Sequence, residues 1–438
     1  MSTLKLHTRL ADELANSITQ GRLPGGSALP THRAFASQQG IGLSTATRIY
    51  AELQRRGLIV GEVGRGTFVR ERPVEPGPLS EAMRYTALAR TAETVDAPTL
   101  RQALRTVSGL SDLERLAAQP SPFGSASSRR AVGEHLQRRQ LGLAGDSARI
   151  VITWGGLAAL RLAAILNLHR GQRVASDAVT YPGWRLVMEQ TGLDVVPVSF
   201  DPAGPDLEKL EWLFRRKGVT VLHCMPTAHH PLGWVVPLKR RREIVALARK
   251  HDVALLEDVT YNHLVRDAPP TLAELAPERT WLLGSLSGVM GDGLRFGYLV
   301  APTMLEPRLE RTALSWGVAA PPLIAELGRL WLEDGTIASL QNAQREHAEQ
   351  LWRAASLAGF KAHSPSSSGW LLWLPLPRGY RSEAAVLKLR QQGVDVMSSE
   401  PFAIGSHKPN AVALRMRMLT PATLKEIAPT VLAVCGLS

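Results

Sequence analysis

The sequence predicts an α/β protein in which a large domain with a mainly parallel sheet follows a small, basic, helical domain. From about residue 120, apolar runs of strand length alternate with helical stretches such as 157–168 and 240–251, a pattern typical of βαβ units. The runs predicted as buried strands are 150–153, 173–176, 193–198, 219–223, 253–257 and 297–300. With 438 residues, 45% of them hydrophobic, the chain is long enough for two or three domains and a large core.

Positive charge is concentrated in the first 70 residues. They contain nine Lys and Arg against four Asp and Glu, a net +5, whereas the whole chain has a net charge of +12. A basic surface favours an anionic partner, and nucleic acid is the first candidate.

The N-terminal region begins with two predicted helices. Leu or Ile recurs at every fourth position from Leu6 to Ile18, which predicts an amphipathic helix that ends in the glycine-rich segment 21–26. A second, short helix is expected after Pro30, with Thr31 as its N-cap.

A third predicted helix has the character of a DNA-recognition helix. Ser44 can cap its N-terminus, and an apolar face follows at i, i+3, i+4 and i+7, formed by Ala46, Ile49, Tyr50 and Leu53. Thr45, Thr47 and Arg48 then project away from the core near the N-terminal end, where such a helix meets base edges and phosphates. We therefore expect a helix-turn-helix that enters the major groove.

Residues 58–69 are predicted to form a two-stranded wing. Leu58–Val60 and Thr67–Val69 have strand character and are joined by a glycine-rich turn. Arg65 would lie at the tip beside Gly66, where it could approach a phosphate or the minor groove. The alternative is that Arg33, Arg48 and Arg65 are ordinary solvated surface charges.

A Pro-rich segment marks the predicted domain boundary. Residues 71–78 contain prolines that can continue neither a helix nor a central strand. We therefore predict a DNA-binding domain over 1–70, a linker over 71–90 and a ligand-sensing domain over 91–438.

The composition also limits the compartment. The chain has no run of 18 apolar residues and no basic-then-apolar signal pattern at its start, so we expect a cytoplasmic protein without a membrane segment. Cys224 and Cys435 are too few and too isolated for a disulfide framework or a zinc site, and we expect both to be buried.

Several predicted strands end in residues suited to a phosphorylated heterocycle. Gly155 and Gly156 join a strand to a helix, so their backbone amides could hold a phosphate, although a simple turn is the alternative. Asp258 could pair with a protonated pyridine nitrogen and Tyr261 with a ring oxygen; the alternative for Asp258 is a helix cap.

Two further groups fit the same ligand. Tyr181 could place its ring against a heterocycle, and ordinary packing is the alternative. Arg295, with the hydroxyls of Ser285 and Ser287, could neutralise a phosphate through its guanidinium fork.

The N-terminal segments 29–36, 40–47, 57–58 and 64–69 together closely resemble the GntR-type winged helix-turn-helix. The strand-end segments resemble, in order and spacing, the aminotransferase-like domain of fold-type I pyridoxal-phosphate (PLP) proteins. The whole chain thus resembles the MocR subfamily of transcriptional regulators over nearly all its residues.

This resemblance implies PLP-dependent control of transcription by a homodimer, for which a head-to-tail domain swap is one arrangement. The partners implied are a double-stranded DNA operator and a small-molecule effector. The residues expected round the cofactor are Gly155, Gly156, Tyr181, His230, Asp258, Tyr261, Ser285, Ser287, Gly288 and Arg295, with Arg415 expected to bind a ligand carboxylate.

Several positions depart from the family pattern. Thr45 follows the capping serine where many relatives have arginine, so the operator sequence cannot be transferred. His230 stands where an Asn-Pro-x-Gly motif supplies an amide to the ring oxygen, and imidazole can still donate there. Phe123 replaces a frequent tyrosine, which removes a phosphate hydroxyl. His229 and His230 are adjacent residues without further ligands, so we predict no metal site.

Gly288 is the largest departure, because it lies seven residues before Arg295, where the Schiff-base lysine belongs. Without that amine PLP cannot form an internal aldimine, and the base for the usual proton transfer is also lost. Lys408 is the lysine nearest to this place in the fold, and we do not expect it to replace the Schiff-base lysine. Three explanations stay open: PLP binds without a covalent bond, another phosphorylated or carboxylated ligand has replaced it, or a lysine has been substituted in this copy.

The sequence therefore predicts a DNA-binding regulator that senses PLP or a PLP–amine adduct and has no catalytic residue. The first alternative is an aminotransferase with an appended DNA-binding module, against which Gly288 argues. The second is a PLP reservoir without an operator, against which the basic N-terminal domain argues.

Overall fold

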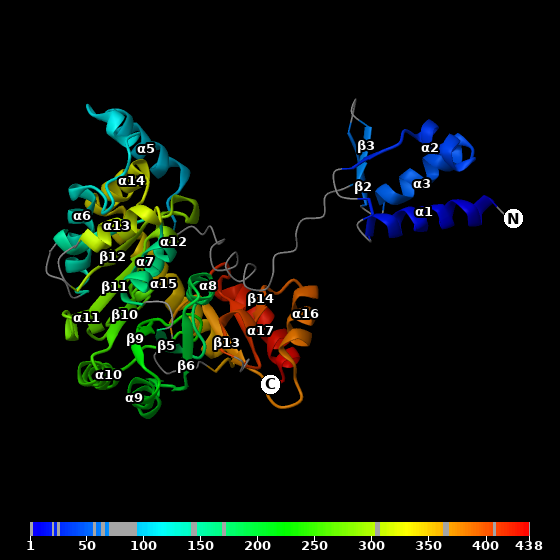
Figure 1. Cartoon of the computed structure of the whole chain (residues 1–438). Coiled ribbons are helices and arrows are strands. Elements are labelled where there is room, and N and C mark those ends of the chain that lie inside the picture. Colours follow the sequence, from blue (N-terminus) through cyan, green and yellow to red (C-terminus); the bar gives the residue numbers. More distant parts are fainter. Residues whose placement is uncertain are drawn as a thin grey trace. The chain divides into compact units, whose positions relative to one another are not determined.

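The computed structural model describes residues 3–19, 22–23, 27–55, 58–62, 66–69, 94–141, 147–168, 172–302, 307–361, 368–405 and 409–437. The chain divides into two compact units, Met1–Gly77 and Pro78–Ser438 (Figure 1). The predicted linker at 71–90 and Arg65 lie outside the described residues, so the domain boundary stays a prediction.

In the residues that the structure describes, the N-terminal unit has the three predicted helices and a small sheet that contains the predicted wing. The helices are α1 (Thr3–Thr19), α2 (His32–Gln39) and α3 (Leu43–Arg55). The antiparallel sheet has the order β1-β3-β2 and consists of β1 (Ala28–Leu29), β2 (Ile59–Glu62) and β3 (Gly66–Val69). β1 was not predicted, because a two-residue strand leaves no periodic pattern in the sequence.

The core of this unit follows the predicted helix faces. The four apolar residues of α3 predicted on its inner face are all buried, namely Ala46, Ile49, Tyr50 and Leu53. Thr31 caps α2 by accepting the amide of Ala34 at 3.3 Å, as expected. The predicted cap of α3 is wrong, because the carbonyl of Gly42 already accepts the amide of Ala46 and Ser44 stands inside the first turn.

The large unit is built on a seven-stranded sheet with the order β4-β12-β11-β10-β9-β5-β6. Its strands are β4 (Ile150–Thr153), β5 (Arg173–Asp177), β6 (Asp194–Val198), β9 (Val219–Cys224), β10 (Ala254–Asp258), β11 (Thr280–Ser285) and β12 (Gly297–Val300). Pairing is parallel from β6 to β11, whereas β12 runs antiparallel to both its neighbours. The mainly parallel sheet is confirmed. All six predicted strands are present, and β11 is an additional one.

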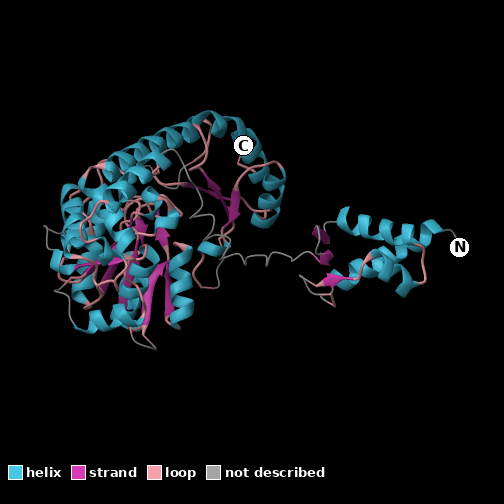
Figure 2. Ribbon diagram, turned by 90° about the horizontal axis from the view of Figure 1, so that it is seen from above, coloured by secondary structure: helices cyan, strands magenta, loops and turns pink. Residues whose placement is uncertain are grey.

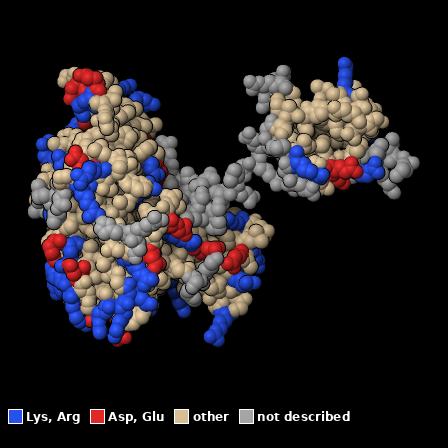
Figure 3. Space-filling model, viewed as in Figure 1, with Lys and Arg blue, Asp and Glu red and all other residues tan. Residues whose placement is uncertain are grey.

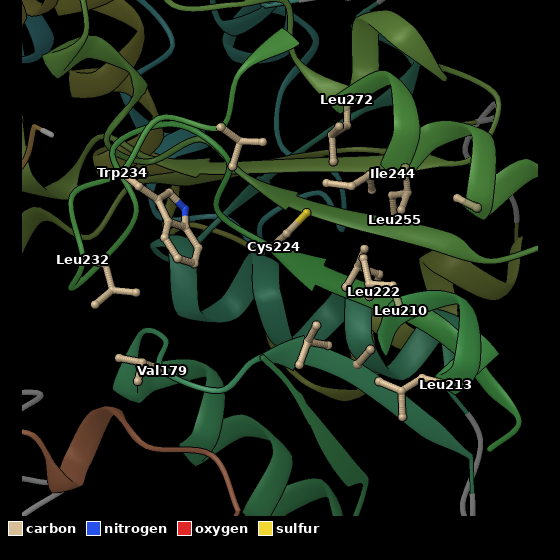
Figure 4. Close-up of a cluster of buried hydrophobic side chains, with 14 of the residues drawn as sticks. Val179, Leu210, Leu213, Leu222, Cys224, Leu232, Trp234, Ile244, Leu255 and Leu272 are labelled. Atoms are coloured by element: carbon tan, nitrogen blue, oxygen red, sulfur yellow. The ribbon is translucent and has the colours of Figure 1, made fainter. Parts of the chain in front are cut away.

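Helices cover both faces of this sheet (Figure 2). Successive residues of β10 show why: Leu255 packs with α9 (Leu207–Arg216) and α10 (Leu238–Lys250) on one face, and Leu256 packs with α7 (Gly156–Asn167) and α8 (Pro182–Thr191) on the other. Figure 4 shows the first of these clusters, in which the thiol of Cys224 lies among Leu222, Leu255 and Trp234. Both cysteines are free and buried, as predicted.

A smaller antiparallel sheet completes the unit, with the order β13-β15-β14. Its strands are β13 (Leu371–Pro375), β14 (Val396–Ser398) and β15 (Ala411–Arg415), and a two-stranded ribbon is formed by β7 (Phe200–Asp201) and β8 (Gly204–Pro205). The helices are α5 (Ala97–Ser108), α6 (Ala126–Arg138), α7 (Gly156–Asn167), α8 (Pro182–Thr191), α9 (Leu207–Arg216), α10 (Leu238–Lys250), α11 (Leu272–Leu275), α12 (Ser287–Met290), α13 (Pro307–Ser315), α14 (Pro322–Glu333), α15 (Thr336–Leu357), α16 (Ser382–Gln391) and α17 (Pro421–Cys435).

Two further features of the structure are the distribution of surface charge and the hydropathy of the helices. Figure 3 shows that Lys and Arg also gather on the lower part of the large unit in that view, where α9 and α10 lie, so positive charge is not confined to the N-terminal unit. In the part of the chain that the structure describes, no helix combines the length and apolar character needed to cross a membrane.

Candidate functional site

The predicted site residues lie along one edge of the seven-stranded sheet. Asp258 ends β10 and Ser285 ends β11, and these strands are parallel, so both residues reach the same edge. The antiparallel β12 begins at that edge, because Gly297 pairs with Ser285 on one side and with Thr153 on the other. Strand order and register therefore bring together segments that are far apart in the sequence.

Gly155 and Gly156 form one end of the site at the start of α7. Gly155 has φ of 81° at the N-cap, a backbone conformation that favours glycine. A Cβ on Gly155 would lie 3.4 Å from Nε of Arg295, and one on Gly156 would lie 3.0 Å from Cβ of Ser285. A helix N-terminus, a guanidinium and a hydroxyl thus lie close together, an arrangement suited to an anion.

The two serines also stabilise the loop that follows β11. Oγ of Ser285 donates to Oγ of Ser287 at 3.0 Å, and the amide of Phe296 donates to Oγ of Ser287 at 3.1 Å. Ser287 is therefore engaged with the backbone of its own loop in this structure. Its predicted contact with a phosphate stays a prediction.

Asp258 forms the other end of the site and is only 5% exposed. Its Oδ1 accepts the amide of Thr260 at 2.8 Å, and the next helical turn begins only at Asn262, so Asp258 does not cap a helix. Burial raises the pKa of its carboxyl to about 6, against the opposing effect of the hydrogen bonds from Thr260. A cation placed beside this carboxylate would stabilise its charged form.

Three rings stand near Asp258. The rings of His230 and Tyr261 stack with centroids 5.5 Å apart, and Tyr181 meets His230 edge to face at 5.8 Å. Burial lowers the pKa of His230 to about 3, with a smaller effect of His229, and burial raises the pKa of Tyr261 to about 12. Burial also raises the pKa of Tyr181, so all three rings are neutral near pH 7.

His230 carries an unused hydrogen-bonding atom. Its side chain is buried, with the residue 5% exposed, and Nε2 has no hydrogen-bond partner among the described residues. A buried polar atom without a partner is destabilising, and a ligand that accepts or donates there would remove that cost.

Gly288 lies in the short helix α12 directly after Ser287. A Cβ on Gly288 would meet only NH1 of Arg417, at 3.7 Å, among the described atoms within 4 Å. The carbonyl of Gly288 accepts hydrogen bonds from NH2 of Arg417 at 2.6 Å and from Nε2 of Gln344 at 2.9 Å. A Cβ at this position would therefore meet no clash with the described atoms.

Arg417 was not among the residues predicted for the site, whereas Arg415 was. Nε of Arg415 donates to Oδ2 of Asp395 at 2.6 Å, so the guanidinium at the end of β15 forms an ion pair with the carboxylate just before β14. The only sequence signal for Arg417 is its position two residues beyond Arg415. The carboxylate-binding role of Arg415 stays a prediction.

The predicted DNA contacts lie on α2 and α3 of the other unit. Arg33 and Arg48 are exposed, and Thr45 is half-buried. Oγ1 of Thr47 donates to the carbonyl of Leu43 at 3.0 Å, so its hydroxyl is directed back to its own helix. Gly66 begins β3 and is exposed.

Comparison with known families assigns both units. The family described as "Bacterial regulatory proteins, gntR family" matches residues 6–69, and the family described as "Aminotransferase class I and II" matches residues 89–431. The latter fold implies binding of pyridoxal phosphate. In the residues that the structure describes, no group of three or more His, Cys, Asp or Glu could hold a metal ion.

The chain is similar to individual relatives over most of its length. The uncharacterized HTH-type transcriptional regulator YdeF of Bacillus subtilis is 25% identical over 96% of this chain and 92% of its own length. The HTH-type regulator TauR of Rhodobacter capsulatus is 26% identical over 91% and 89%, and the pyridoxine biosynthesis regulator PdxR of Corynebacterium glutamicum is 26% identical over 72% and 70%. Among solved structures, the α-aminoadipate aminotransferase LysN of Thermus thermophilus superposes with a TM-score of 0.70 at 21% identity, over 83% and 96%.

A GntR domain that binds DNA and an aminotransferase-like domain define a class of transcriptional regulators. The chain belongs to the MocR subfamily of this class.

Proposed function

We propose that the large unit binds PLP, or a PLP–amine adduct, without a covalent bond to the protein, and that this binding controls the affinity of the winged unit for its operator. One observation carries the proposal: the phosphate-type end at Gly155, Gly156 and Arg295 and the ring-type end at Asp258 belong to one sheet edge. A regulator named for pyridoxine biosynthesis is among the relatives.

Observations at three residues test whether this chain fits the cofactor. The buried Nε2 of His230 has no partner among the described residues, and Asp258 is a buried carboxyl that a protonated ring nitrogen would stabilise. A Cβ on Gly288 would meet no described atom closer than 3.7 Å. The residues present therefore fit a pyridine ring that carries a phosphate.

Each group then has a separate role. Arg295 and the amides at the start of α7 bind the phosphate, and Asp258 accepts from the ring nitrogen. Tyr181 packs on the ring, while Tyr261 and His230 hold its 3-oxygen. PLP supplies an aldehyde that condenses with amines, and Gly288 offers no amine to retain it.

The glycine at position 288 also argues against transamination as the function. The lysine normally moves the proton in that reaction, and Gly288 has no group that can do so. We infer that the large unit is a sensor, that it acts as a homodimer, and that the ligand changes the relative placement of two winged units.

The test combines DNA binding with absorption spectra. Purified protein should retard DNA from its own upstream region, and PLP should change that affinity. PLP should leave the wild type when it is dialysed, whereas Gly288→Lys should retain it after borohydride reduction, as a mass increase on that residue. If neither protein binds PLP, the ligand assignment is wrong; if PLP binds without any effect on DNA, the regulatory coupling is wrong.

A further inference from the structure

Gln344, on the long helix α15, forms hydrogen bonds with two separate segments of the candidate site. It is only 1% exposed. Its Nε2 donates to the carbonyl of Gly288 in α12 at 2.9 Å, and its Oε1 lies 2.9 Å from Nε2 of His263. His263 belongs to η3 (Asn262–Leu264), the helical turn that directly follows Tyr261. One buried amide thus joins two segments that are separated in the chain by β11.

The chemistry of the two partners sets the orientation of this amide. A backbone carbonyl only accepts hydrogen bonds, so the nitrogen of the Gln344 amide must face Gly288 and its oxygen must face His263. An amide oxygen also only accepts, so Nε2 of His263 carries a proton and donates it. If the amide were reversed, its oxygen would face the carbonyl oxygen of Gly288. Both hydrogen bonds therefore depend on one orientation of one side chain.

Apolar packing on both sides of Gln344 holds α15 against the same two segments. In the first half of the helix, Ile337 belongs to the buried cluster that includes Val289 of α12. In the second half, Leu351 belongs to the cluster that includes Leu264 of η3. This second cluster also contains residues of all three strands of the small sheet. The amide thus lies among apolar groups, where a buried hydrogen bond is electrostatically strong and a lost one is costly.

The carbonyl of Gly288 has a second donor, NH2 of Arg417 at 2.6 Å. Arg417 lies just beyond β15, so this bond joins α12 to the end of the small sheet. Loss of the Gln344 amide would leave that carbonyl with the guanidinium and would remove this acceptor from His263. The link between α12 and η3 would be broken while the link between α12 and the small sheet remains.

We propose that Gln344 is a positioning residue that couples the loop at Gly288 to Tyr261, so that these two parts of the site move together with α15. Gln344 acts through the backbone of Gly288 and the ring of His263. The inference rests in part on the proposed function, in which Tyr261 binds the 3-oxygen of the ligand. A ligand that displaces Tyr261 would then also displace α15 and the small sheet packed against it, and the shape of the large unit would follow the ligand.

Hydrogen exchange in the ligand-free, full-length protein tests the coupling directly. The amide of Gly291 donates to the carbonyl of Ser287 at 2.9 Å and reports on α12, and the amide of Leu264 donates to the carbonyl of Tyr261 at 2.9 Å and reports on η3. Gln344→Leu should speed exchange at both amides by about three- to tenfold, the value of one lost hydrogen bond.

Two further variants make this result specific. Gln341, one turn earlier on α15, is 4% exposed and accepts from NH1 of Arg139 at 3.2 Å, so Gln341→Leu removes a buried amide from the same helix. It should leave both reporter amides within about twofold of the wild type. Gln344→Glu keeps an oxygen for His263 but, ionised beside Arg417, offers no donor to Gly288. It should speed exchange only in α12, and it decides the question if Gln344→Leu does not fold.

The ionisation of bound pyridoxamine 5′-phosphate reports on the position of Tyr261 rather than on stability. A hydrogen bond from Tyr261 favours the ionised 3-oxygen, so Tyr261→Phe should raise the pKa of the bound 3-hydroxyl by about one unit, measured as a pH shift of its absorption spectrum. Gln344→Leu should raise this pKa by about half a unit or more, and the double variant should raise it no further than Tyr261→Phe alone. Gln341→Leu should leave it unchanged.

The inference is overturned if Gln344→Leu speeds exchange at neither reporter, at only one of them, or equally throughout the chain. A spectral shift that adds to that of Tyr261→Phe would also overturn it. Failure of the wild type to bind pyridoxamine 5′-phosphate would instead contradict the proposed function, and the exchange rates measured without ligand would still decide the role of Gln344.

Discussion

The imidazole of His230 stacks on the phenol of Tyr261 with an interplanar angle of 26° and with 5.5 Å between ring centroids. Tyr181 approaches the same imidazole from its edge. His230 thus stands between two tyrosines at the ring end of the site, and its low pKa keeps it neutral. An imidazole here can replace the amide that the family motif supplies.

Substitution of His230 should separate its hydrogen bond from its stacking. His230→Phe keeps an aromatic ring but has no N–H, so PLP affinity should fall about three- to tenfold, the value of one neutral hydrogen bond. His230→Asn restores an amide and should bind PLP at least as tightly as the wild type. Fluorescence titration measures both. Because the pKa is about 3, the ratio of wild-type to His230→Phe affinity should stay constant between about pH 6 and 8; a ratio that changes over this range would show that His230 titrates.

Asp258→Asn should remove PLP binding and change the pH dependence of stability. The folded-state pKa is raised to about 6 from 3.8, so the neutral carboxyl contributes stability at low pH that is lost as the pH rises through about 6. The ligand-free wild type should therefore lose stability relative to Asp258→Asn between about pH 4 and 8, by up to about 3 kcal/mol. Unfolding midpoints of both proteins at several pH values measure this difference.

The neighbouring carboxyl provides the matched control. Glu257 is fully buried, and its two oxygens accept the amides of Leu272 and Ala273 at 3.0 and 2.9 Å, at the start of α11. Burial raises its pKa to about 7, with the same sign of pH dependence. Glu257→Gln should lower stability by about 1–2 kcal/mol, because one acceptor is lost, yet leave PLP binding in place. Loss of PLP in both variants would show that the effect of Asp258 is structural.

Gly183→Ala should displace the ring of Tyr181. A Cβ on Gly183 would lie 2.3 Å from Cε1 of Tyr181, so the ring must move away from its present place. Since stacking on an aromatic ring contributes about 0.5–1.5 kcal/mol, PLP affinity should fall about two- to tenfold. Gly293→Ala is the control, because nothing lies within 4 Å of its Cβ among the described atoms. Equal binding by both variants would mean that Tyr181 does not pack on the ligand.

The sequence predicted those features that depend on local patterns. The cap at Thr31, the buried face of α3 and the residues that end β4 and β10 follow from periodicity and from short turn signals. β11 escaped prediction because its apolar stretch, Trp281–Leu283, is short and is followed by residues with loop character. The apolar run at 370–374 is a signal for β13, a strand that was not predicted.

Long-range partners could not be predicted in the same way. Arg415 and Arg417 are alternate residues of one segment and look equivalent in the sequence. The structure distinguishes them, because Asp395 lies beside Arg415 and Gly288 lies beside Arg417. Each partner is brought there by another element of the fold, so the surroundings of each guanidinium follow only from the assembled chain.

Arg48→Ala should weaken operator binding, and a second arginine of the same helix provides a matched control. Arg48 is exposed near the N-terminal half of α3, whereas Arg55, in its last turn, forms an ion pair with Glu52 at 2.7 Å. If Arg48 contacts a phosphate, Arg48→Ala should lower affinity similarly for operator and unrelated DNA and reduce the slope of log K against log salt by about 1. If it contacts a base, the loss should be about 1–3 kcal/mol and confined to the operator.

Arg55→Ala should change the DNA affinity and the salt slope much less, since its charge already has a partner on the helix. Electrophoretic mobility shifts at several salt concentrations measure both, and equal effects of the two substitutions would mean that the N-terminal half of α3 is not the part that meets DNA.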